Sequence, residues 1–116
     1  MPLRLRWLGP LLLLGCLDTF APPGAVEFTP PPVYLTWWEE IEACAQLTGD
    51  FGRIAWYEVP GSEYACPAYT NGCAGWWQPP HTIYMAETRL DDRRLVEHEM
   101  LHDLLQRSDH PAQPLV

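Results

Sequence analysis

The chain has 116 residues and a formal net charge of −8, and all seven of its basic residues are arginines. Nucleic-acid binding is disfavoured, because phosphate backbones are bound by clustered positive charge, which this acidic chain does not offer. The length allows one domain with a small core, and such domains often need a crosslink.

Residues 1–15 are predicted to be a signal peptide. Arg4 and Arg6 precede an apolar run that is too short to span a membrane. The run ends in an L-x-G-C sequence, Leu13 to Cys16, which resembles the bacterial lipobox. The resemblance implies that the signal is removed and that Cys16 becomes the lipidated first residue of the mature protein. A plain secretory signal with an incidental cysteine is the alternative.

Lipidation would anchor the mature chain in the bacterial cell envelope, facing outside the cytoplasm, since each buried CH₂ contributes about 0.8 kcal/mol. The residue after the lipidated cysteine influences sorting, and an aspartate there favours retention at the inner membrane. This position holds Leu17, so we expect the protein at the outer membrane or the cell surface. Five arginines and fifteen acidic residues follow Cys16, so the mature chain carries a net charge of −10.

The mature chain divides into a tether and one domain. Residues 16–33 are rich in proline and lack periodicity, so they are predicted to form an extended tether that ends before the domain, residues 34–116. Thr36 and Glu39 form a capping box, which predicts a first helix over residues 37–48.

Two strands and an irregular loop are predicted next. Residues 53–59 are rich in aromatic and branched side chains, and residues 82–86 repeat that pattern, so both are predicted strands. Between them, residues 61–80 hold many glycines and prolines and are predicted to be a loop. Trp76 and Trp77 in this loop either wall a cleft or pack into the core.

Three cysteines remain after Cys16. Cys66 and Cys73 flank the turn-forming pair Asn71-Gly72, so a local disulfide between them is predicted. Cys44 lies on the predicted buried side of the first helix and is left as an unmatched thiol. A longer natural chain with another cysteine near its end would give Cys44 a partner. A structural zinc site built on these cysteines is the less favoured alternative.

The last predicted helix, residues 91–106, carries the sequence His98-Glu99-Met100-Leu101-His102, which is H-E-x-x-H. Residues four apart on a helix lie one turn apart on one face, so the two imidazoles can share one zinc ion. Glu99 lies within reach of a water molecule on that ion without having to bind the metal.

A catalytic zinc ion usually has three protein ligands. His110, eight residues after His102, is the candidate third ligand, and Asp109 and Asp103 are its rivals.

The motif and the downstream histidine resemble those of zincin metallopeptidases of the metzincin type, with two extra residues before the third histidine. The resemblance covers His98 to His110 and implies a minimal zincin-like α+β domain, in which a small β-sheet packs with an N-terminal helix and an active-site helix. It further implies Zn²⁺ as cofactor, a peptide or protein substrate, and Glu99 as the catalytic base. The strand before the motif helix would bind substrate through an open edge, at Ile83, Tyr84 and Met85.

Two other classes remain open. The histidines could hold metal without catalysis in a metal-binding lipoprotein, or the pentapeptide could be accidental in a structural lipoprotein.

Overall fold

The computed structural model describes residues 21–67 and 69–110 of the chain. The predicted signal peptide and Cys16 lie outside these residues. No helix within the described ranges is long and apolar enough to cross a membrane.

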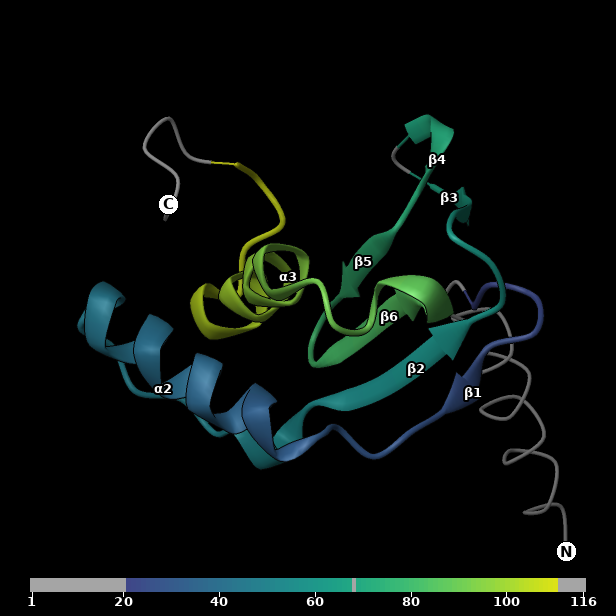
Figure 1. Cartoon of the computed structure of the whole chain (residues 1–116). Helices are drawn as coiled ribbons and strands as arrows, with labels where there is room; N and C mark the ends of the chain where they lie inside the picture. The colour runs from purple at the N-terminus through teal and green to yellow at the C-terminus, as the bar shows by residue number, and fades with distance from the viewer. Residues whose placement is uncertain (1–20, 68, 111–116) are drawn as a thin grey trace, which may run out of the picture.

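Two helices and a four-stranded sheet form the body of the domain (Figure 1). The helices are α2 (Pro32–Ala45) and α3 (Arg93–Leu105), with short 3₁₀ helices η1 (Phe51–Arg53) and η2 (Glu87–Arg89). The strands are β1 (Val26–Glu27), β2 (Ala55–Val59), β3 (Tyr64–Cys66), β4 (Tyr69–Cys73), β5 (Gly75–Gln78) and β6 (Thr82–Ala86). The predicted α+β class is confirmed.

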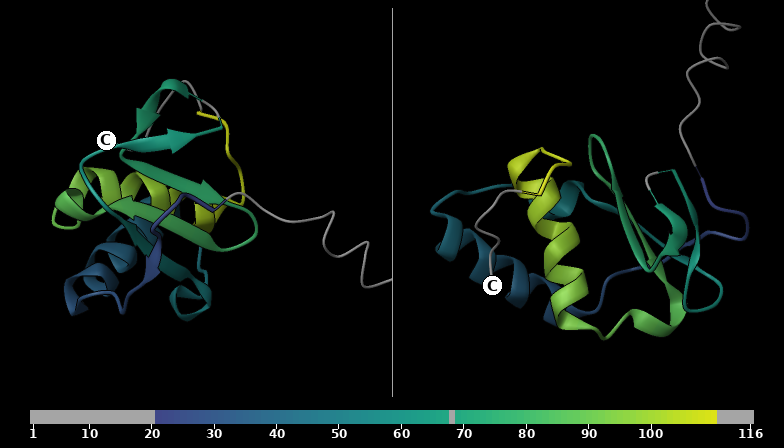
Figure 2. Two further views of the ribbon diagram at one scale, coloured as in Figure 1. Left: turned by 90° about the vertical axis from the view of Figure 1, so that its right-hand side faces the viewer. Right: turned by 90° about the horizontal axis from the view of Figure 1, so that it is seen from above.

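The sheet has the order β1-β2-β6-β5, with β2 and β6 parallel and the two outer strands antiparallel to their neighbours. Both helices lie on one side of it (Figure 2). Alternation along β6 sends Ile83 and Met85 into the core beneath the helices, and Tyr84 and Ala86 to the opposite face. Each face of the central strand is therefore buried.

The β3–β4 hairpin packs on the face opposite the helices. The Tyr64 hydroxyl donates a hydrogen bond to the Tyr84 carbonyl oxygen at 2.8 Å, which fastens the hairpin to β6. Cys66 and Cys73 form a disulfide across the hairpin. The segment predicted as an irregular loop thus contains three strands, because pairing with distant residues organises it.

The N-terminal part of the domain differs from the predictions. The predicted tether, residues 16–33, is not a free linker throughout, since Val26–Glu27 pairs with β2 and Phe28 packs against Trp56. The first helix begins at Pro32 and not at residue 37, because a proline at the first helical position needs no hydrogen-bond partner for its nitrogen.

Cys44 is exposed, so the prediction that it lies on the buried side of the first helix is wrong. The helix buries Tyr34, Trp38 and Ile41, and this face is rotated away from Cys44.

Loss of the Cys66–Cys73 disulfide should lower the free energy of unfolding by about 2–3 kcal/mol, since the closed loop is short and its closure removes little chain entropy. Urea unfolding of the Cys66→Ser/Cys73→Ser protein would measure this loss. The exposed Cys44→Ser change is the control and should cost less than about 0.5 kcal/mol. A peptide map that joins Cys44 to either other cysteine would refute the assignment.

Candidate metal centre

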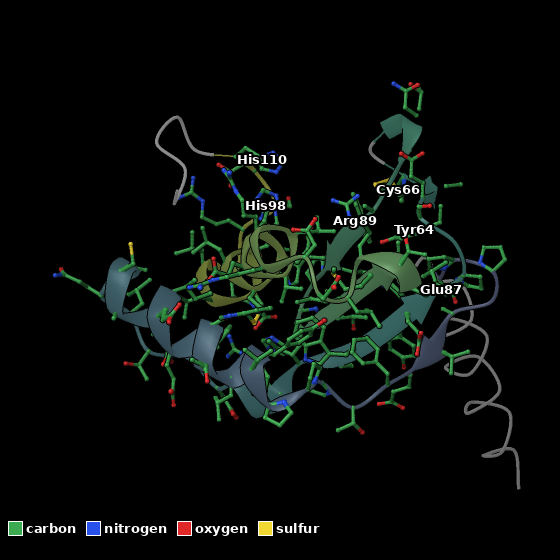
Figure 3. All side chains as sticks on the ribbon, viewed as in Figure 1. Tyr64, Cys66, Glu87, Arg89, His98 and His110 are labelled. Carbon is green, nitrogen blue, oxygen red and sulfur yellow. A yellow bond between two sulfur atoms is a disulfide. The ribbon has the colours of Figure 1, made fainter. Side chains whose placement is uncertain are left out.

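Three histidines converge beside α3. His98 and His102 project one turn apart from α3, and His110 returns to them from the segment after the helix, as Figure 3 shows for His98 and His110. One potential ligand atom from each lies within 4.8 Å of the others. The Nε2 atoms of His98 and His110 are 3.2 Å apart. Among the described residues this is the group of side chains placed to hold a metal ion.

The turn that returns His110 depends on Gln106. This residue ends α3 in the left-handed backbone conformation, with φ of 55°. Residues other than glycine adopt this conformation less readily. The side-chain nitrogen Nε2 of Gln106 donates hydrogen bonds to the carbonyl oxygens of Asp103 and Pro80, both at 2.8 Å. These bonds hold the turn without a glycine.

The ring of His102 has a fixed orientation. Its Nδ1 atom lies 2.7 Å from the Arg107 carbonyl oxygen, an acceptor that requires a proton on Nδ1. A neutral His102 therefore presents an unprotonated Nε2 to the group. Burial lowers the pKa of His102, and burial with the neighbouring histidines lowers the pKa of His98 to about 4. Both shifts favour the neutral imidazole, which is the form that binds metal.

The two rival ligands are engaged elsewhere. Both carboxylate oxygens of Asp109 accept hydrogen bonds from Arg107, at 2.9 and 2.6 Å. Asp103 is fully buried and bonded to Trp77 and His81. His110 is therefore the third member of the group by position.

Glu99 is 5% exposed and its carboxylate lies against β5. A Cβ atom added to Gly75 would stand 2.9 Å from Oε2 of Glu99, so the absence of a side chain at residue 75 makes room for the carboxylate. Burial raises the pKa of Glu99 to about 8, because the loss of hydration disfavours the charged carboxylate.

The histidines and Glu99 line one hollow of about 150 Å³. Its lining residues are Gly75, Trp76, Trp77, His98, Glu99, His102, Ser108 and His110. The hollow therefore lies between α3, the segment that follows α3, and the edge strand β5. A divalent ion and a small polar group would fit in it.

The donor set suits zinc. Zinc–nitrogen bonds of about 2.0–2.1 Å in a tetrahedral site place two ligand nitrogens about 3.3 Å apart, close to the 3.2 Å between His98 and His110. Neutral imidazoles are common zinc ligands, and the Arg107 carbonyl oxygen orients the ring of His102 as such sites require.

The structure does not place Ile83, Tyr84 and Met85 at the hollow. All three are at most 5% exposed, and β6 is paired on both sides, so the prediction that they form an open substrate-binding edge is wrong. The edge strand at the hollow is β5. Sequence reasoning missed Gly75, since no local pattern marks a glycine that faces a carboxylate.

Comparison of the chain with family models, with curated protein sequences and with solved structures gave no match. The function of the chain is therefore inferred from the geometry of the centre.

Proposed function

We propose that this protein is a membrane-anchored, zinc-dependent metallopeptidase. The observation that supports it best is the presence of Glu99 in the same hollow as His98, His102 and His110. Three imidazoles satisfy the ligand requirement of a catalytic zinc site, and the hollow leaves space for water. A buried carboxyl beside that space is suited to proton transfer.

Each residue would have a separate task in peptide hydrolysis. His98, His102 and His110 hold the ion, and zinc, when bound, supplies a Lewis acid that activates water and polarises a carbonyl group. The positive charge of a bound zinc ion would lower the pKa of Glu99, and the ionised carboxylate would then accept a proton from the attacking water and give it to the leaving amine. The bond broken is the C–N bond of the peptide, and water supplies the new hydroxyl group and the proton.

The edge position of β5 favours an extended peptide as substrate. This strand lines the hollow and has one neighbour, β6, in the described sheet. A peptide that paired with its outer edge would be held by main-chain hydrogen bonds and would pass beside the histidines. Such binding accepts many sequences, because it uses main-chain groups.

Metal analysis and peptide hydrolysis by the full-length protein in detergent test the proposal. We expect one zinc ion per chain and cleavage of a broad peptide library, both lost after treatment with a chelator. Stoichiometric zinc without hydrolysis would instead favour a metal-binding lipoprotein. A chain that binds no metal would leave the H-E-x-x-H sequence accidental.

Gly75→Ala should reduce kcat by about 10–10²-fold, because the added methyl group displaces the Glu99 carboxylate, and small displacements of reacting groups have effects of this size. Zinc content should stay at one per chain. Gly52→Ala is the matched control: its Cβ would stand 3.3 Å from Asp50, away from the hollow. Unchanged kcat in Gly75→Ala would show that the contact with Glu99 has no catalytic consequence.

Cys16→Ser should move the protein from the membrane fraction to the soluble fraction, since the acyl chains would be lost. Cys44→Ser should remain in the membrane fraction and serves as the control. Mass spectrometry should find lipid on Cys16 as the mature amino terminus. An unmodified terminus elsewhere would contradict the anchor.

A further inference from the structure

Asp103 is a fully buried carboxylate that the proposed mechanism does not use. It follows His102 in the sequence and is not among the residues that line the hollow. Its Oδ1 atom accepts a hydrogen bond from Trp77 Nε1 at 3.0 Å and lies 3.0 Å from His81 Nδ1. Its Oδ2 atom accepts one from Arg53 Nε at 3.3 Å. Three separate segments therefore meet at one side chain of α3.

Burying a carboxylate in this position is costly, because the group loses its hydration even though Arg53 pairs with it. An apolar residue could fill the same space without that penalty. The bonds of Asp103 therefore need an explanation beyond core packing.

Trp77 supplies that explanation. Its indole stacks on the imidazole of His102, with ring centroids 5.9 Å apart and planes 19° apart. The nitrogen of the same indole is bonded to Asp103. His102 is thus held at Nδ1 by the Arg107 carbonyl oxygen and on one face by an indole that Asp103 fixes.

We propose that Asp103 is a positioning residue of the metal centre, acting through Trp77 on the orientation of His102. The hydrogen bond between Trp77 and Asp103 also joins α3, which carries Glu99, to the edge strand β5. The inference rests on the proposed function in one respect, that His102 is a zinc ligand.

The test measures zinc affinity and the visible absorption spectrum of bound Co²⁺ in the full-length protein. Asp103→Ala removes the acceptor, and Trp77→Phe removes the donor while leaving a ring beside His102. Each should weaken zinc binding by roughly 10–100-fold, the scale for residues that orient a ligand, and should shift the Co²⁺ bands. Asp103→Asn keeps an acceptor for the indole and should restore most of the affinity.

The double variant Asp103→Ala/Trp77→Phe tests whether Asp103 acts on His102 through Trp77 or whether the two residues affect zinc binding independently. If Asp103 acts through Trp77, the double variant should bind zinc no more weakly than the weaker of the two single variants. Additive losses would overturn the path. Val96→Ala, a core change on the same helix, is the control for lost stability and should leave the Co²⁺ spectrum unchanged.

Two results distinguish the possible failures. Wild-type protein that binds zinc, with Asp103→Ala and Trp77→Phe both within about twofold of it and with unchanged Co²⁺ spectra, would overturn only the role of Asp103. Wild-type protein that binds no zinc would overturn the proposed function and this inference together.

Discussion

Replacing Glu99 with glutamine should leave zinc bound while peptide hydrolysis falls by roughly 10²–10⁴-fold, the usual contribution of general acid–base catalysis. Glutamine has nearly the size and shape of glutamate, so it fits the buried place beside Gly75. Its amide cannot take a proton from water, and the three histidines are untouched. Zinc content and steady-state hydrolysis of a fluorogenic peptide library, measured on the same preparation, would show the separation.

Glu97→Gln is the matched control for this change. Glu97 lies on the same helix, two residues away, and accepts a hydrogen bond from Arg93 on the protein surface. Its replacement should alter neither zinc content nor hydrolysis. Full activity in Glu99→Gln would assign proton transfer to another group, and loss of zinc in that variant would make Glu99 a ligand.

The helix that carries the H-E-x-x-H sequence was predictable because the residues that determine it lie within the same short segment. Apolar residues at spacings of three and four, with Asp92 ahead of them, predict a helix over residues 91–106, and α3 spans Arg93–Leu105 with Asp92 as its N-cap. The placement of His98 and His102 on one face follows from helix geometry alone. The strand expected at residues 82–86 coincides with β6 for a similar reason.

Parts of the centre that depend on distant contacts were less predictable. His110 reaches the other histidines because Gln106 adopts a left-handed conformation and its side chain bonds to Pro80. No rule of local spacing distinguishes that turn from one that would leave His110 in solvent. The sequence alone therefore left His110, Asp109 and Asp103 as alternatives for the third ligand.

The open strand edge was expected at the wrong strand for a similar reason. A run such as residues 82–86 predicts a strand, but its neighbours in the sheet depend on segments elsewhere in the chain. Here β5 covers the side of β6 that the sequence left open. Because β5 also carries Gly75 and Trp77, its pairing with β6 decides which side chains surround Glu99 and His102.

His98→Ala and His102→Ala should each abolish tight zinc binding, and hydrolysis with it. Both rings project from α3 one turn apart, and removing either breaks this helical pair and leaves two protein ligands where a catalytic site normally needs three. His110→Ala should weaken binding severely, because the pair on α3 would remain in place. All three losses should exceed the roughly 10–100-fold expected for a residue that only orients a ligand.

Competition with a chromogenic chelator would measure these affinities, and two variants serve as controls. Asp109→Asn should keep zinc, since its carboxylate is paired with Arg107. Glu97→Gln should also keep it, because Glu97 accepts a hydrogen bond from Arg93 on the protein surface and lies outside the group of three. If Asp109→Asn lost zinc while His110→Ala retained it, the third ligand would be Asp109. If His98→Ala and His102→Ala both kept tight binding, the ion would have to be held elsewhere, and the proposed peptidase centre would fail.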